Sequence, residues 1–222
     1  MKNLCIIPAR GGSKRIPLKN IRNFLGKPII AYSIETAIES CLFNEVMVST
    51  DDEKIAEVAK KFGALIPFFR SEAMSNDYAP LADVVDEVKA SYLKIGKQFD
   101  CICLILPTAP LITKENLLKG YNILVKEKVD SVRPVVRFSY PIQRALKLND
   151  GKMEMFYPQY LSTRSQDLEP AFHDAGQFYW MLYEPALKGK NKYAFEISET
   201  MAQDIDCDDD WKIAEMKYKL FK

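Results

Sequence analysis

The chain has 222 residues, 48% of them hydrophobic, with 31 basic and 30 acidic side chains. A chain of this length can bury one substantial core, so we expect a single domain over residues 1–222. Because the charges nearly cancel, no global field favours nucleic acid or an anionic membrane, and neither is expected as a partner.

The cysteine pattern bears on the compartment. The five cysteines are an odd number scattered along the chain, which fits reduced thiols better than a disulfide framework. Cys101 and Cys103 could form a metal pair, but alternation in a buried strand is favoured, since no second Cys pair supports zinc. The sequence begins at once with a strand-like run, and no stretch has the apolar length of a membrane span. We therefore expect a cytoplasmic protein.

In chain order, apolar runs alternate with amphipathic segments over the first 136 residues. The predicted strands cover residues 4–8, 46–49, 65–69, 101–106 and 130–136. The predicted helices cover about 28–41, 53–62, 80–95 and 114–126. This alternation predicts an α/β fold, Rossmann-like, with a mostly parallel central sheet flanked by helices. Its ligand crevice should lie at the carboxyl ends of the strands.

The segment 137–176 has a different composition, with three prolines and many aromatic residues. Its turn, Asn149-Asp150-Gly151, is typical of a hairpin. We interpret the segment as an arm that projects from the sheet, whose aromatic side chains would need a partner surface. The alternative is a lid that packs on its own chain. Strands over 177–182 and 193–198 and a helix over about 208–220 complete the chain.

The loop behind the first strand is rich in glycine and in cations. Gly11 and Gly12 let backbone N–H groups turn toward an anion without a Cβ in the way. The cations Arg10, Lys14, Arg15 and Lys19 would neutralise a triphosphate. A Walker A loop is excluded because the glycines are adjacent, and a Rossmann fingerprint because no third glycine follows. The pattern favours a phosphate-binding loop over an exposed basic turn.

Two carboxylates near the C-terminus form a candidate metal site. Asp204 and Asp206 are separated by one residue, so in an extended segment both point to one side while Ile205 faces the core. Such a pair can hold Mg²⁺, or Mn²⁺, which prefer oxygen ligands and are often shared with substrate phosphates. The alternative is that acids here merely flank the start of the last helix, an interpretation that we adopt for residues 208–210.

Residues Ile7 to Asn20 resemble the signature loop of the CMP-sialic acid synthetase (acylneuraminate cytidylyltransferase) family. The resemblance continues through residues 48–52, 70–72, 107–111 and 204–206, and the segment 172–180 is most similar to the branch that activates pseudaminic acid. It implies a nucleotide-diphospho-sugar transferase-like fold with CTP and a nine-carbon sugar acid as substrates. The anomeric hydroxyl of the sugar acid would attack the α-phosphate of CTP, and pyrophosphate would leave.

The resemblance also implies which residues form the site. The implied nucleotide-binding residues are Ala9, Arg10, Gly11, Gly12, Ser13, Lys14, Lys19, Asn20, Arg70 and Asp77. Arg10 and Lys14, with Mg²⁺ on Asp204 and Asp206, would carry catalysis by stabilising phosphate charge. Arg70 could instead be a surface ion-pair partner of Glu72, and Asp77 a simple helix-cap residue.

The implied sugar-acid residues are Arg164, His173 and Gln177. A guanidinium suits the substrate carboxylate, although Arg164 could equally be an ordinary loop arginine. Leu106, Ala109 and Ile112 stand where sialic acid enzymes carry glutamine, serine and arginine, which favours pseudaminic acid. The family's arm packs across a dimer, so a homodimer is expected. Synthetases for sialic, legionaminic or octulosonic acids remain alternatives, and a non-catalytic nucleotide-binding protein is a remote one.

Overall fold

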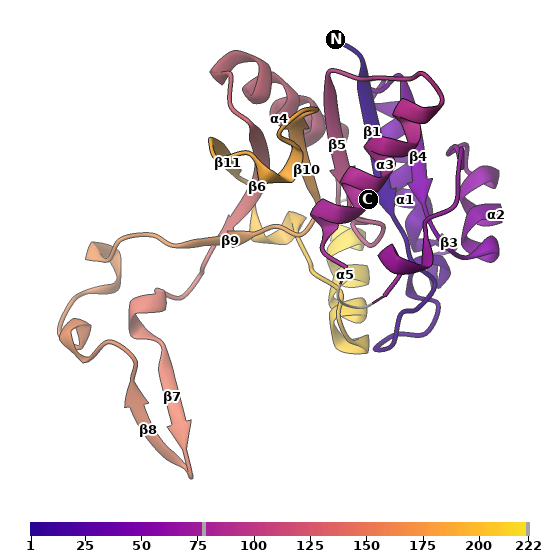
Figure 1. Ribbon diagram of the computed structural model, residues 1–222. Helices are drawn as coiled ribbons and strands as arrows, with labels where there is room; N and C mark the ends of the chain where they lie inside the picture. The colour runs from indigo at the N-terminus through magenta and orange to yellow at the C-terminus, as the bar shows by residue number, and fades with distance from the viewer. Residues whose placement is uncertain (77–78, 221–222) are drawn as a thin grey trace.

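A seven-stranded sheet forms the centre of the protein (Figure 1). The computed structural model describes residues 1–76 and 79–220. The strand order is β11-β6-β10-β5-β1-β4, and β9 pairs with β6. The strands are β1 (Asn3–Pro8), β4 (Glu45–Ser49), β5 (Cys101–Ile105), β6 (Ser131–Arg137), β9 (Phe172–Asp174), β10 (Phe178–Leu182) and β11 (Lys192–Glu196).

Three neighbouring strands, β5, β1 and β4, form a parallel part of the sheet. β1 pairs in parallel with both β4 and β5, and β11 pairs in parallel with β6. β10 runs antiparallel between β5 and β6, and β9 runs antiparallel to β6. Every residue of β1 and β5 is buried, as expected for strands covered on both faces. The predicted α/β fold with a mostly parallel central sheet is therefore confirmed.

Helices cover both faces of the sheet. They are α1 (Ile29–Glu39), α2 (Glu53–Lys61), α3 (Leu81–Lys94), α4 (Lys114–Glu127) and α5 (Asp208–Leu220). Apolar residues of α1, α2 and α4 form one core with Cys5 and Ile7, whereas α3 packs on the opposite face against Leu4 and Ile6. This division follows from the alternation of side chains along β1.

The start of two helices follows from a capping side chain. The Asp52 carboxylate accepts a hydrogen bond from the Ile55 amide at 3.0 Å, and the Thr113 hydroxyl accepts one from Asn116 at 3.2 Å. Both caps come directly after segments that leave the carboxyl edge of the sheet. The caps therefore fix where these connecting segments end.

The predicted strand over 65–69 is wrong. Only Leu65 forms an isolated bridge, with Met47, and no strand follows it. Leu65 and Phe69 are 47% and 52% exposed, while Ile66 and Phe68 between them pack against the core. Pro67 has no N–H to donate to a strand ladder, which explains why the pairing stops.

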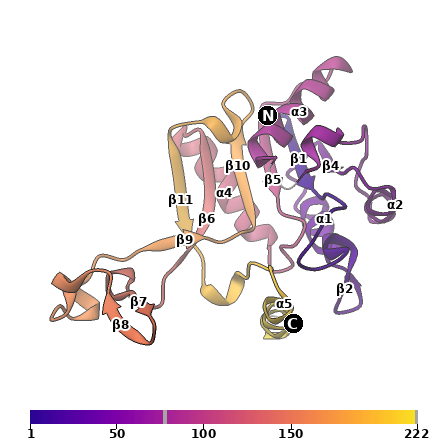
Figure 2. The same cartoon turned by 60° about the horizontal axis from the view of Figure 1, so that its bottom comes forward.

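The segment 137–176 carries a hairpin that extends away from the sheet in both views (Figures 1 and 2). β7 (Leu146–Asn149) and β8 (Lys152–Met155) pair antiparallel around a turn with positive φ at Asp150 and Gly151. Large apolar side chains remain exposed along the segment 137–176, including Leu148 at 72% and Leu161 at 73%. A second small ribbon, β2 (Asn23–Phe24) with β3 (Lys27–Pro28), precedes α1. No helix in the described part of the chain combines the length and apolar composition of a membrane span.

Candidate active site

A pocket of about 170 Å³ lies where β1 and β5 end. Its lining comes from the loop after β1 and from the segment after β5, so it opens at the carboxyl edge of the sheet. The lining residues are Pro8, Arg10, Ser13, Lys14, Arg15, Ile16, Lys19, Asn20, Pro107 and Thr108. The structure thus gathers five of the predicted nucleotide-binding residues, Arg10, Ser13, Lys14, Lys19 and Asn20, around one pocket.

Hydrogen bonds fix the shape of this loop. The Asp51 carboxylate accepts a bond from the Gly11 amide at 3.0 Å, and the Asn20 side chain donates to the carbonyl of Arg10 at 3.0 Å. Asn20 is 5% exposed, so its amide group acts mainly from inside the loop. Asp51 was not predicted as a site residue. Its position directly after a buried strand, at the edge where the first loop lies, is the signal that could have identified it.

Gly11 is required by a close approach. A Cβ at Gly11 would lie 2.8 Å from Asp52 Oδ2 and 2.9 Å from Asp52 Cβ, whereas a Cβ at Gly12 would have nothing within 4 Å. The loop therefore packs directly on the capping residue of α2. Ala9, fully buried, continues the pairing of β1 by donating to the Ser49 carbonyl at 2.9 Å.

Arg70 is buried at the end of β4. It is 8% exposed, and its guanidinium donates to the hydroxyl and the carbonyl of Ser49 at 3.0 and 2.6 Å. Burial lowers the pKa of Arg70, and the nearby carboxylates of Asp51 and Glu87 oppose that shift. The alternative interpretation as a surface partner of Glu72 is therefore wrong.

The acidic segment contacts the loop directly. Ile205 is fully buried between the exposed Asp204 and the partly exposed Asp206, as the spacing predicts, although the segment belongs to no strand. Lys19 Nζ donates to the Ile205 carbonyl at 2.6 Å and lies 3.8 Å from Asp206. Arg15 Nη1 lies 2.7 Å from Asp206 Oδ2. Two segments 186 residues apart thus form one site.

Electrostatics couple the same groups. Burial lowers the pKa of Lys19, and the carboxylates of Asp206 and Asp204 oppose that shift. Residues 208–210 form the first turn of α5, as predicted. Within that turn the Asp210 carboxylate also accepts from the amides of Asp206 and Cys207 at 3.0 and 2.9 Å, which fixes Asp206 in place.

The donor set fits a magnesium ion that is shared with a substrate. Among residues 1–76 and 79–220, no three His, Cys, Asp or Glu side chains are placed to hold a metal together. Within the described residues, Asp204 and Asp206 form a pair of carboxylates beside a cationic loop. One or two carboxylates completed by phosphate oxygens and water is the usual environment of Mg²⁺.

The residues predicted for the sugar acid occupy different places. His173 lies on β9, with Nδ1 2.9 Å from the Asp174 carbonyl and its ring 4.9 Å from that of Phe138. Gln177 is 2% exposed and donates to the Met201 carbonyl at 2.5 Å, while its Oε1 has no partner among the described residues. Between them, Gly176 lies against Asp204.

Arg164 lies in the arm and not beside the pocket of its own chain. Its guanidinium is paired with Asp167 at 2.7 Å and is 72% exposed. Asp77 lies outside the described residues. Ala109 and Ile112 are 2% and 5% exposed, so both belong mainly to the core.

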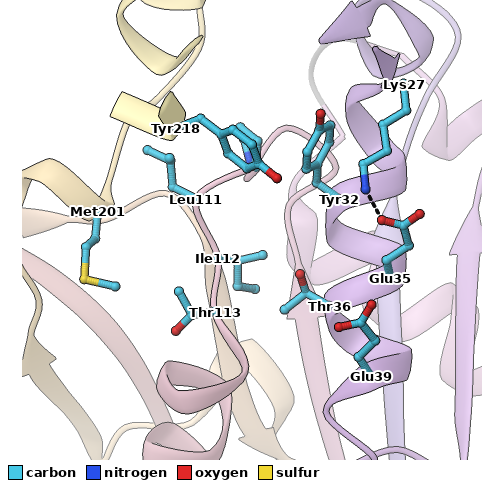
Figure 3. A pocket seen from close by; sticks show the side chains of 11 residues that line it. Lys27, Tyr32, Glu35, Thr36, Glu39, Leu111, Ile112, Thr113, Met201 and Tyr218 are labelled. Atoms are coloured by element: carbon cyan, nitrogen blue, oxygen red, sulfur yellow. Dashed lines mark hydrogen bonds and ion pairs between the residues drawn. The ribbon is translucent and has the colours of Figure 1, made fainter. Parts of the chain in front are cut away.

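A second pocket, of about 440 Å³, lies between α1, α5 and the segment 110–113 (Figure 3). Glu35 and Glu39 contribute carboxylates, and Lys27 is already paired with Glu35. Tyr32 and Tyr218, both in its lining, pack edge to face with ring centroids 5.1 Å apart. Its acidic lining makes it a poorer site for phosphate than the cationic loop pocket.

Comparison with known proteins identifies the family. The family model described as cytidylyltransferase matches residues 4–218. The chain belongs to the cytidylyltransferase family. As a member it is a nucleotidyltransferase.

Several relatives of this cytidylyltransferase are known. It is 43% identical over 226 residues to the pseudaminic acid cytidylyltransferase of Campylobacter jejuni, which covers 99% of this chain and 97% of that protein. It is 32% identical to the CMP-N,N'-diacetyllegionaminic acid synthase of Legionella pneumophila, with the same coverage of both chains. It is 31% identical to the post-translational flagellin modification protein B of Campylobacter coli, over 97% of this chain and 94% of that one.

A solved structure supports the fold. The CMP:2-keto-3-deoxy-manno-octonic acid synthetase complexed with CTP matches with a TM-score of 0.72 and 17% identity, over 100% of both chains. At this identity the match concerns the fold of the cytidylyltransferase, not its substrate.

Proposed function

We propose that the cytidylyltransferase activates pseudaminic acid, converting CTP and pseudaminic acid into CMP-pseudaminic acid and pyrophosphate. The observation that carries the proposal is the 43% identity, along the whole chain, to an enzyme of that name. The relative named for legionaminic acid is 32% identical over the same share of this chain. The joined loop and acidic segment supply what transfer of a nucleotidyl group requires: cations for the triphosphate beside carboxylates for a metal.

In this proposal the loop binds the triphosphate of CTP. Arg10 and Lys14 neutralise its charge, and the amides of Gly11, Gly12 and Ser13 supply donors. Lys19 holds the loop against the acidic segment through its hydrogen bond to the Ile205 carbonyl. Asn20 fixes the shape of the loop through its hydrogen bond to the Arg10 carbonyl. Arg70, buried next to Asp51, supports the side of the pocket expected to receive the cytosine ring.

Asp204 and Asp206 would hold Mg²⁺, or Mn²⁺. The ion would supply Lewis-acid stabilisation of the phosphate charge. The anomeric hydroxyl of the sugar acid gives up its proton to solvent, its oxygen forms a bond to the α-phosphorus, and the bond from that phosphorus to the bridging oxygen of pyrophosphate breaks. Arg10 and Lys14 stabilise the charge on the leaving pyrophosphate.

The proposal includes a homodimer. Arg164 lies in the projecting arm, and the same arm exposes Leu148 and Leu161. A second copy that covers these apolar side chains would also receive Arg164. We propose that Arg164 of one copy binds the carboxylate of a sugar acid that is held by the second copy. His173 and Gln177 of that second copy would contact the other side of the same sugar acid.

A cytoplasmic location belongs to the same proposal, because CTP is a cytoplasmic metabolite. The free thiols of all five cysteines fit a reducing compartment. The product would then serve the synthesis of a surface glycan, such as one attached to flagellin.

The test compares the rates with different sugar acids at fixed concentrations of CTP and Mg²⁺. The rate with each acid is measured as the release of pyrophosphate. We expect kcat/KM for pseudaminic acid to exceed that for N-acetylneuraminic acid by about 10-fold or more, as pocket contacts of this kind allow. Legionaminic and octulosonic acids complete the panel. A higher kcat/KM for any of the other acids would assign the enzyme to that acid instead.

A further inference from the structure

The face of the sheet next to Asp204 carries polar side chains. Val132 on β6 and Trp180 on β10 are paired, and both point into the core under α4. By alternation, Arg133 and Tyr179 point to the opposite face. β6, β9 and β10 lie together there (Figure 2), and Asp174 ends β9 beside them.

Arg133, Asp174 and Tyr179 form one cluster on this face. Arg133 Nη1 lies 2.9 Å from Asp174 Oδ2, and the guanidinium carbon lies 4.7 Å from the centre of the Tyr179 ring. Asp174 Oδ1 accepts from the Gly176 amide at 2.9 Å. The Asp174 carboxylate is also near enough to act on the Tyr179 phenol electrostatically. The orientation of the ion pair is therefore fixed by the Gly176 amide on one side and by the Tyr179 ring on the other.

This cluster is adjacent to the proposed reaction centre. Gly176, with φ at +64°, brings the chain so close to the acidic segment that a Cβ there would lie 3.8 Å from Asp204 Cβ. Asp204 is also near enough to act on Tyr179 electrostatically. Burial raises the pKa of Tyr179, so the phenol stays protonated and remains a donor.

The pair remains accessible to a ligand. The side chains of Arg133 and Asp174 are 31% and 34% exposed. A guanidinium has five N–H donors and a carboxylate about four acceptor positions, so the contacts above leave both groups with capacity. An ion pair that is about one-third exposed contributes little to stability by itself, so stability alone does not account for its placement beside Asp204.

A donor and an acceptor side by side are complementary to an amide, whose C=O accepts and whose N–H donates. We propose that the Arg133–Asp174 pair, held on Tyr179, binds an acylamino group of the sugar acid and selects for acids that carry it. This inference rests on the proposed function. Arg133 donates to the oxygen of the acylamino group, and Asp174 accepts from its nitrogen. The Tyr179 ring holds the Arg133 guanidinium in place by a cation–π contact.

The test combines protein variants with substrate analogues. Arg133→Lys keeps the charge but loses the planar fork, and Asp174→Asn keeps the shape but loses the charge. Each is measured with pseudaminic acid and with two analogues, in each of which one acylamino group is replaced by hydroxyl. Binding is followed by calorimetry in the presence of a non-hydrolysable CTP analogue, and turnover by pyrophosphate release.

We expect each variant to weaken binding of pseudaminic acid about 10- to 100-fold, the usual effect of losing a hydrogen bond to a charged group. The analogue that lacks the acylamino group bound by the pair should bind equally well to the wild type and to the variants. The KM for CTP and the melting temperature should not change. Lys188→Gln, which removes another exposed ion pair, with Asp86, serves as the matched control and should leave all constants at wild-type values.

Equal weakening of all three ligands, or no weakening at all, would overturn the assignment while leaving the proposed function intact. If wild type turns over a different acylamino acid, the same variants are tested on that acid and its hydroxyl analogues. Failure of wild type with every acid of the panel would overturn the proposed function, and the assignment with it.

Discussion

Replacing Asp204 or Asp206 with asparagine is expected to lower the rate of CMP-sugar formation by about 100-fold or more, the scale on which lost transition-state electrostatics act. The amide keeps the shape of the side chain but binds a divalent cation poorly. Asp204 is exposed and Asp206 partly so, while Ile205 between them carries the packing, so the fold should survive. The measurement is turnover at saturating CTP over a series of Mg²⁺ concentrations.

Asp209→Asn is the control for this experiment. Asp209 belongs to the same acidic run, but it starts α5 and pairs with Lys212 at 3.0 Å. Its loss should leave turnover within about 2-fold, because an exposed pair of this kind contributes little. Near-normal rates for the Asp204 and Asp206 variants at limiting Mg²⁺ would show that these acids only flank the helix.

Gly11→Ala is expected to damage both the fold and the binding of CTP. The new Cβ would lie 2.8 Å from the Asp52 carboxylate that caps α2, so the loop or the cap must move. Overpacking of this kind costs about 1–3 kcal/mol of the free energy of unfolding. A loop displaced by about 1 Å misplaces the phosphates, and we expect kcat/KM for CTP to fall about 100-fold.

Gly12→Ala separates the two effects. Apart from its neighbours in sequence, no atom of the described residues lies within 4 Å of its added Cβ, so the free energy of unfolding should stay within about 0.5 kcal/mol of wild type. Binding of CTP should nevertheless weaken, since the methyl group stands where the backbone approaches the phosphates. Denaturant unfolding and titration with CTP measure the two quantities. Tight CTP binding by both variants would contradict the assignment of this loop to the triphosphate.

The sequence was sufficient for features that depend on local pattern. Uninterrupted apolar runs predicted the buried strands β1 and β5, and Asp52 and Thr113 fixed the starts of two helices. The spacing of Asp204 and Asp206 predicted that Ile205 would be buried. The one wrong strand, at 65–69, came from giving apolar composition more weight than Pro67.

Contacts between distant segments could not be predicted in the same way. Lys19 looked like a free cation for a phosphate, yet its ammonium group bonds to the carbonyl of Ile205. A surface pair with Glu72 was one of two interpretations of Arg70, but its side chain is buried against Ser49. Arg133 lies on a strand and was assigned no role from the sequence. Its charge among apolar neighbours was a signal, but its partner Asp174 is 41 residues away, and only the sheet register brings them together.

The central claim is that this chain transfers CMP from CTP to a sugar acid, and phosphorus NMR of the reaction mixture tests it most directly. With CTP, pseudaminic acid and Mg²⁺, we predict a new CMP phosphodiester resonance and pyrophosphate in equal amounts, both absent when the sugar acid is omitted. Release of phosphate or CMP from CTP without a sugar phosphodiester, or unchanged CTP with every acid of the panel, would contradict the claim.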